Sequence, residues 1–405
     1  MKKAELLSPA GAMPQLKAAI DYGADAVYCG AKKFGLRAYA GNFDAEALSE
    51  AASYAHKRGV KLYVTFNAFL YDDNMEDAAK TMEMIGKSGA DAAIVSDIAA
   101  ILLAKEHAPN LPIHVSTQAN TLNSLSARHW YELGASRIIL ARELSLERIS
   151  SMREKLPEDL ELEAFVHGAM CASYSGRCVL SNHLSGRDAN QGGCVQPCRW
   201  KYALVEEKRP GKYLPIAEDE NGTYIYSAND LCMIEHVPEL LKAGISSLKI
   251  EGRMKTEYYV ATVTGAYRRA MDNFYADPEA PFDKTLLDEV KRASHRPLST
   301  GFYYGKPDSP PGTAEYKQDS VFVANVISYD SENKRVHVRQ RNKFLNGETL
   351  TRLSPEGTVS FKVEDLRDDE GKTVESAPHP MQRLSFKCDI PMNEGDFIRR
   401  DLDKS

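Results

Sequence analysis

The sequence of 405 residues lacks the features of a membrane or exported protein. No apolar run is long enough to span a bilayer, and residues 1–9 hold two lysines but no apolar core of signal-peptide length. An excess of basic residues is also missing, because the formal net charge is −6. This charge argues against a protein that coats nucleic acid indiscriminately, but it allows a local basic face. We therefore expect a soluble, cytoplasmic protein.

The standard peptidase motifs are missing as well. The chain has no H-E-x-x-H zinc motif, no G-x-S-x-G nucleophile motif and no paired aspartate motif. A cysteine nucleophile would need a metal-free thiol with a histidine at hydrogen-bond distance. Cys198 with either His167 or His183 is the pairing that the sequence offers. Peptidase activity is therefore the weaker alternative on the residues alone.

What the chain does have is a repeated unit of helix and strand. In four segments a helical stretch ends in glycine and is followed by small residues and a short apolar run, as at a helix-to-strand joint. Four further apolar runs complete eight expected strands, within residues 5–11, 22–30, 61–67, 88–97, 112–120, 133–143, 160–167 and 243–253. Helical patterns such as 46–58 and 122–132 separate them. We predict an α/β fold in which residues 1–300 form a (β/α)8 TIM-like barrel, with an open sheet as the alternative.

Polar residues gather where these strands end. In a barrel, all the carboxyl ends of the strands open on one face, where barrel active sites are built. The polar residues at the strand ends that we assign to this face are Ser8, Asn67, Gln118, Asn120, Arg142, Glu143, His167, Lys249, Glu251 and Arg253. Strand ends are polar in any protein, so some of these would only cap or solvate. Lys249, Glu251 and Arg253 alternate at strand spacing and share one side, either to contact a substrate or to form an ion-pair ladder inside the barrel.

The long segment 168–245, inserted after the seventh strand, holds five of the seven cysteines. In a reducing compartment, clustered thiols more often bind a metal than form disulfides. The spacings C-x6-C, C-x15-C and C-x3-C resemble neither a zinc ribbon nor a ferredoxin run, so an iron–sulfur cluster, zinc and free thiols all remain open. The five are Cys171, Cys178, Cys194, Cys198 and Cys232. Cys29 and Cys388 stand apart, and we expect them to be buried as small apolar residues.

After a linker at 301–320, the hydrophobic period changes to that of strands. Six short alternating segments in 321–405 predict a small antiparallel β-barrel domain. Its basic run holds Arg335, Arg339, Arg341 and Lys343. This run is either a solvated face or a positive stripe that neutralises the phosphates of a tRNA.

Two motifs in the insertion resemble a known family. The pattern E-x-F-x-x-G-A-x-C at 163–171, followed by G-x-C-x-x-S at 176–181, is similar to the signature of the collagenase-like peptidase family U32. Further stretches resemble the family's tRNA branch, the prephenate-dependent tRNA uridine hydroxylation proteins. They lie at 5–11, 23–28, 142–145, 187–192, 248–253 and 300–302.

This resemblance implies a function and a set of site residues. It implies hydroxylation of the wobble uridine of tRNA at C5 to 5-hydroxyuridine, with prephenate as the hydroxyl source and a 4Fe-4S cluster as cofactor. Zinc would be an alternative in material prepared in air. Cluster ligands would be Cys171, Cys178, Cys194 and Cys232, with Cys198 as a rival for the fourth place.

The small dicarboxylate prephenate would bind at the barrel mouth, and protons would move there. The predicted contacts are Ser8, Asn67, Gln118, Asn120, Arg142, Arg177, Lys249 and Arg253, with Glu143, Glu251 and His167 as proton carriers. Expected partners are tRNA and a second subunit of the same family. Two alternatives stay open: a peptidase or other hydrolase, and a zinc-stabilised tRNA-binding protein without activity.

Overall fold

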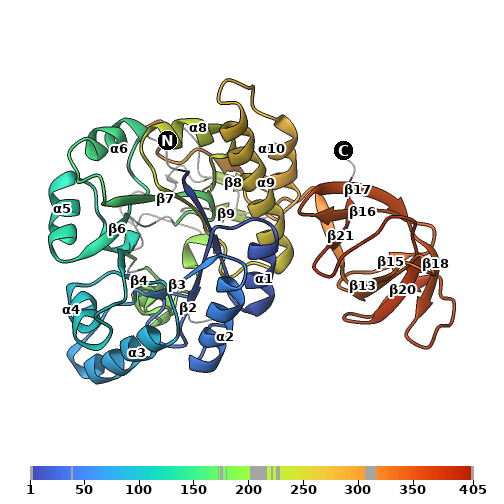
Figure 1. The fold of residues 1–405 in the computed structure, drawn as a ribbon, viewed down its shortest axis with the longest axis horizontal. Coiled ribbons are helices and arrows are strands. Elements are labelled where there is room, and N and C mark those ends of the chain that lie inside the picture. The colour runs from blue at the N-terminus through green and yellow to red at the C-terminus, as the bar shows by residue number, and fades with distance from the viewer. Residues whose placement is uncertain are drawn as a thin grey trace, which may run out of the picture.

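The computed structural model describes residues 3–37, 40–171, 173, 177–178, 180–200, 217–219, 222–224, 229–305 and 316–402. Its larger part is a closed parallel barrel (Figure 1). The sheet order runs from β1 to β7, and β11 pairs in parallel with both β7 and β1. This double pairing closes the ring and confirms the barrel over the open sheet. The eight strands are β1 (Glu5–Pro9), β2 (Ala26–Gly30), β3 (Lys61–Phe66), β4 (Ala92–Val95), β5 (Ile113–Val115), β6 (Ala135–Ile139), β7 (Glu161–Gly168) and β11 (Ser247–Ile250).

Helices on the outside of the ring connect these strands (Figure 1). Gly23, Gly89, Gly134 and Gly244 follow helices with φ between +85° and +99°, which confirms the predicted joints because such angles disfavour other residues. The helices are α1 (Met13–Asp21), α2 (Ala45–His56), α3 (Met75–Lys87), α4 (Ile98–His107), α5 (Ser124–Glu132), α6 (Leu146–Arg153), α8 (Val237–Lys242), α9 (Glu257–Ala276) and α10 (Lys284–Lys291). None of the helices in the described ranges is long and apolar enough to cross a membrane.

The cysteine-rich insertion leaves β7 and returns to it. Strand β10 (Asp230–Cys232) pairs antiparallel with the end of β7, and β12 (Leu298–Ser299) pairs in parallel with β10. The sequence did not predict these two strands. Within the insertion lie α7 (Leu180–Ser185), the short 3-10 helices η4 (Ala189–Gln191) and η5 (Pro197–Arg199), and the hairpin of β8 (Ala217–Asp219) and β9 (Gly222–Tyr224).

The C-terminal domain is the predicted antiparallel β-structure. Seven strands run in the order β17-β16-β21-β13-β14-β20-β18, and β15 pairs with β19. All six expected strands are present, and β15, β18 and β19 are additional. The strands are β13 (Ser320–Asp330), β14 (Arg335–Gln340), β15 (Phe344–Leu345), β16 (Thr349–Ser354), β17 (Gly357–Lys362), β18 (Glu364–Asp368), β19 (Ser376–Ala377), β20 (Arg383–Lys387) and β21 (Phe397–Asp401). Half of the predicted linker, residues 306–315, lies outside the described residues.

This domain packs on the outer helices of the barrel (Figure 1). The ring of Tyr258 on α9 stacks on Phe322 with 5.1 Å between centroids, and Phe397 lies against both. Arg399 of β21 makes a two-pronged ion pair with Glu289 of α10, with N–O distances of 2.6 and 3.0 Å. Because both charged side chains are buried, the contact holds the domain in one position beside the barrel.

Candidate active site at the barrel mouth

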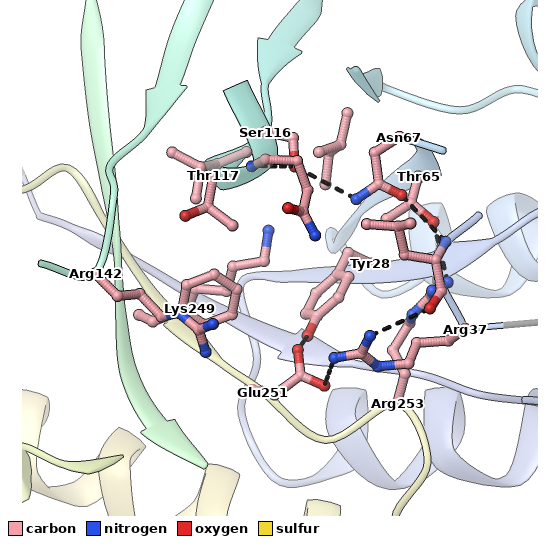
Figure 2. A pocket seen from close by; sticks show the side chains of 15 residues that line it. Tyr28, Arg37, Thr65, Asn67, Ser116, Thr117, Arg142, Lys249, Glu251 and Arg253 are labelled. Carbon is pink, nitrogen blue, oxygen red and sulfur yellow. Dashed lines mark hydrogen bonds and ion pairs between the residues drawn. The ribbon is translucent and has the colours of Figure 1, made fainter. Parts of the chain in front are cut away.

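A polar cavity of about 70 Å³ lies among the carboxyl ends of the barrel strands. Figure 2 shows its side chains converging from several strands. Of the residues predicted for this face, six line the cavity: Asn67, Gln118, Arg142, Lys249, Glu251 and Arg253. The other lining residues are Tyr28, Leu36, Arg37, Thr65, Ile94, Ser116, Thr117, Ile139 and Phe165.

Lys249 is both a wall of the cavity and part of an ion-pair network beneath it. Its ammonium lies 2.7 Å from the fully buried carboxylate of Glu163, which also lies 3.1 Å from Arg137. Arg137 in turn pairs with Glu5 at 2.6 Å. The Lys249 ammonium lies 4.4 Å from the ring centroid of Tyr28 (Figure 2). The ion-pair network predicted for Lys249 is present, since a buried cation needs such partners, and its contact with a substrate stays a prediction.

Arg142 has an unused hydrogen-bond donor. Its Nη1 donates to the carbonyl of Ala169 at 3.3 Å, and its guanidinium lies 5.7 Å from the ring centroid of Phe165. Its Nε is buried without a hydrogen-bond partner among the described residues. A buried donor in this state costs about 1–3 kcal/mol, which an acceptor on a ligand would recover. A carboxylate matches the fork of the guanidinium.

Glu251 is the carboxylate at this cavity. Arg37 Nη2 lies 3.7 Å from its Oε1, and the hydroxyl of Tyr28 lies 3.4 Å from its Oε2 while donating to the Ile250 carbonyl at 2.9 Å (Figure 2). The charge of Glu251 raises the pKa of Arg37. Burial raises the pKa of Tyr28 well above its ordinary value, so the phenol keeps its proton at neutral pH. Of the three predicted proton carriers, Glu251 is the one that lines the cavity.

Arg253 is buried under the rim of the cavity. Its Nη1 donates to Thr65 Oγ1 at 3.0 Å, and burial lowers its pKa. A Cβ at Gly30 would lie 2.1 Å from that Nη1, so the glycine at the end of β2 leaves room for the guanidinium. Its contact with Thr65 makes Arg253 a support of the wall as well as a lining residue.

Several predicted residues lie elsewhere. The hydroxyl of Ser8 is fully buried and lies 2.9 Å from Thr264 Oγ1 on α9. Asn120 and Glu143 are outside the cavity lining, and Arg177 is an exposed residue of the insertion. Strand position alone did not separate these residues from the lining ones.

His167 also faces away from the cavity. It is 2% exposed, its Nδ1 lies 3.4 Å from the hydroxyl of Tyr267 on α9, and burial lowers its pKa to about 3. The register between β7 and β11 shifts just before it, and such a bulge re-aims the side chains that follow. A neutral, enclosed imidazole is poorly placed to serve Cys198 as a base. The side chain of His183 lies outside the described residues.

Two cysteines of the insertion interact electrostatically with Arg37, which lines this cavity. The backbone N–H of Ser173 donates to Cys171 Sγ, and that of Gln196 donates to Cys194 Sγ, both at 3.4 Å. The charges of Cys171 and Cys194 also raise the pKa of Arg37, after the larger contribution of Glu251. Arg37 thus connects the loop electrostatically with the cavity.

Cys198 and Cys232, the two candidates for the fourth ligand position, have different surroundings. Burial raises the pKa of Cys198, and the charges of Cys171 and Cys194 raise it further, so these three sulfurs are electrostatic neighbours. Gln196, at φ +58°, provides the bend that a C-x3-C pair requires. Cys232 instead lies opposite His167 in the ladder, and burial raises its pKa to about 11.

The cysteines of the insertion are suitable donors for a thiolate-bound group by residue type alone. Across the described ranges, no three His, Cys, Asp or Glu side chains come close enough to bind a metal together. The ligand set, including Cys178, therefore stays a prediction. Cys29 and Cys388 are buried, as expected.

The predicted basic run of the C-terminal domain divides into different environments. Arg335 pairs with Asp365, and Arg341 pairs with Glu257 at 2.9 Å. Arg339 and Lys343 are exposed. The run is therefore not one uniform stripe.

Comparison with known proteins decides the family. The model of peptidase family U32 matches residues 11–311, and that of the family's C-terminal domain matches residues 318–399. The chain belongs to peptidase family U32. It is 39% identical to tRNA hydroxylation protein P1 of Bacillus subtilis over 98% of this chain and 95% of the relative. It is 36% identical to tRNA hydroxylation protein P of Escherichia coli over 93% and 92%, and 45% identical to an uncharacterized protease of Methanocaldococcus jannaschii over 98% of both.

In this U32 protein, sequence reasoning missed several residues that build the site. Tyr28 and Arg37 shape the position of Glu251, and Arg137 supports Glu163 from below. Arg296 is 1% exposed, pairs with Asp230 at 2.8 Å and donates to the carbonyl of Met170, which anchors the start of the insertion. Only Tyr28 carried a usable signal, because it lies near the end of a predicted strand.

Proposed function

We propose that this chain is an RNA-modifying enzyme that hydroxylates uridine in tRNA at C5, with prephenate as the hydroxyl source. The names of the Bacillus subtilis and Escherichia coli relatives, which match nearly full length, support hydroxylation of tRNA. The observation that carries the choice of co-substrate is the buried, unpartnered Nε of Arg142 beside Lys249 in the mouth cavity. Two cations around a small cavity favour a carboxylate ligand.

Each cavity residue has a separate task in this proposal. Arg142 and Lys249 bind one carboxylate of the co-substrate, and the ring of Phe165 between them excludes water from it. Glu251 moves a proton between the reacting groups. Arg37 and the protonated Tyr28 hold its carboxylate in place by an ion pair and a close hydroxyl contact.

A cysteine-bound 4Fe-4S cluster completes the proposal. Cys171, Cys178 and Cys194 would hold it, with Cys198 or Cys232 as the fourth ligand. When bound, the cluster would supply electron transfer beside the cavity. The chain's own contribution is to direct backbone N–H groups at Cys171 and Cys194 and to place Arg37 between the loop and Glu251.

The direct test is product formation by protein purified without oxygen. Unmodified tRNA is incubated with the chain and with or without prephenate, and the digested nucleosides are analysed by mass spectrometry. We expect 5-hydroxyuridine only when prephenate is present. Equal product without it would remove prephenate from the proposal, and no product under either condition would remove the hydroxylase function. A parallel assay with denatured collagen tests the peptidase alternative.

A further inference from the structure

Two arginines face each other on the outer surface of the C-terminal sheet. Arg339 on β14 and Arg383 on β20 are register partners in the antiparallel ladder, and both are exposed. Like charges placed directly opposite each other destabilise a sheet. Neither arginine forms an ion pair with any residue in the described ranges. At the other end of the same strand, by contrast, Arg335 is neutralised by Asp365.

The arginine pair leads into a groove between the two domains. Arg339 lines a groove of about 750 Å³ whose walls come from β13 and β14 on one side and from α1 and α2 on the other. Asn325 of β13, the register partner of Arg339, also lines it. Arg383, Arg339 and Asn325 therefore form a row across three strands that ends in the groove.

The opposite wall of the groove continues the positive surface. Tyr54 of α2 has the guanidinium of Arg58 3.7 Å from its ring centroid and the ammonium of Lys17 5.3 Å from it. These three residues line the groove together. A tyrosine flanked by two cations can bind a phosphate through the charges and stack with a base.

The acidic residues of the groove compensate part of this positive surface. The carboxylate of Glu257 forms an ion pair with the guanidinium of Arg341, with 2.9 Å between Oε1 and Nη1. Asp21, at the end of α1, interacts electrostatically with Arg58, Lys17 and Glu394, and its carboxylate lies next to the position of Gly395. It therefore compensates part of the charge of Lys17 and Arg58, whereas Arg339 and Arg383 have no ion-pair partner among the described residues.

The other end of the groove lies on the mouth side of the barrel. Met13 and Glu257, which line it there, begin the helices that follow β1 and β11. The carboxyl ends of those two strands form part of the mouth. A chain held in the groove can therefore extend toward the cavity without crossing the barrel.

We propose that Arg339 and Arg383, together with Lys17 and Arg58 across the groove, bind the phosphate backbone of the RNA substrate. This inference rests on the proposed function and specifies where the RNA lies on the protein. The bound phosphates neutralise the two facing arginines, for which the described part of the chain provides no ion-pair partner.

The test uses the full-length, metal-loaded chain and measures tRNA affinity at a series of potassium chloride concentrations. The double variant Arg339→Ala/Arg383→Ala should bind tRNA at least about tenfold more weakly and reduce the slope of log affinity against log salt by about 1 to 2, because each lost phosphate contact removes roughly 0.7–0.9. The variant Arg339→Lys/Arg383→Lys keeps both charges and should retain most of the slope. The pair Lys362→Ala/Lys372→Ala removes two exposed charges elsewhere in the domain and serves as the matched control.

Product formation separates failure of this inference from failure of the proposed function. We expect the Arg339→Ala/Arg383→Ala variant to keep kcat and to show a higher KM for tRNA. If the Arg339→Ala/Arg383→Ala variant binds tRNA with unchanged affinity and salt slope while the parent chain makes 5-hydroxyuridine, then the groove proposal is wrong and the hydroxylase function stands. A parent chain that makes no product while its tRNA binding depends on the two arginines would overturn the hydroxylase function and leave the groove intact. Equal losses in the lysine control would also contradict the groove, because the effect would then follow net charge.

Discussion

The proposal that prephenate binds in the mouth cavity depends on Arg142, because its buried Nε has no partner among the described residues. We predict that Arg142→Lys raises the KM for prephenate by about tenfold or more, since lysine retains the charge but loses the forked donor arrangement. The KM for tRNA should change little. Steady-state kinetics with each substrate varied in turn measure both values. If only the KM for tRNA rose, we would conclude that Arg142 contacts the RNA and not prephenate.

Glu251 is the residue to which we assign proton transfer. Glu251→Gln keeps the shape of the side chain and removes its basicity, so we predict that kcat falls by about 10²–10⁴ with a small change in KM. Glu143→Gln is the matched comparison, because Glu143 was predicted for the same role and lies outside the cavity lining. If the Glu143 variant lost more activity than the Glu251 variant, the assignment would be wrong.

The buried side chain of His114 makes the free energy of unfolding depend on pH. It is 5% exposed on β5, and burial lowers its pKa well below the ordinary 6.5, so the unfolded chain binds a proton that the folded chain rejects. Stability due to this residue is therefore complete above about pH 6.5 and is lost as the pH falls below it, at up to about 1.4 kcal/mol per pH unit. We predict that His114→Gln flattens this decline in urea unfolding measured between about pH 4 and 6.5. His167 acts in the same direction, so part of the decline should remain; an unchanged slope would contradict the prediction.

At the scale of elements, the cysteine loop offers two candidates for one ligand position. The thiol of Cys198 interacts electrostatically with Cys171 and Cys194, whereas Cys232 is buried on β10 beside Tyr267. We predict that Cys198→Ser lowers the iron and sulfide content of anaerobically purified protein, whereas Cys232→Ser retains most of it. Metal analysis and the visible absorption of the cluster measure the outcome. The reverse pattern would support Cys232, the ligand expected from the sequence.

The sequence predicted elements well where local chemistry determines them. The four glycine joints required positive φ and fixed the starts of β2, β4, β6 and β11, which are half of the barrel strands. Strand β10 was missed because its pairing depends on a chain that returns from a long insertion. His167 was misplaced because a register shift between two strands reversed its direction, and no local pattern encodes that shift. Arg137 and Arg296 were missed because their partners lie far away in the sequence.

At the scale of the whole molecule, the position of the C-terminal domain determines whether the proposed RNA groove exists. Glu289 and Arg399 hold the two domains together in a buried ion pair. We predict that Glu289→Ala destabilises the protein by about 3 kcal/mol, because among the described residues it leaves the buried Arg399 with Asp401, 2.9 Å away, as its remaining counterion. The double variant Glu289→Leu/Arg399→Met removes both charges and should recover most of this loss. Urea unfolding measures the difference.

The same pair of variants tests whether domain position matters for RNA. In Glu289→Ala the wall formed by β13 and β14 loosens from the wall formed by α1 and α2, so tRNA affinity should fall while prephenate binding at the distant mouth cavity stays unchanged. In the double variant, tRNA affinity should return with stability, because the groove residues are intact in both. If tRNA affinity in Glu289→Ala equals that of the parent chain at a temperature where the domains have loosened, then the RNA does not bridge the two domains.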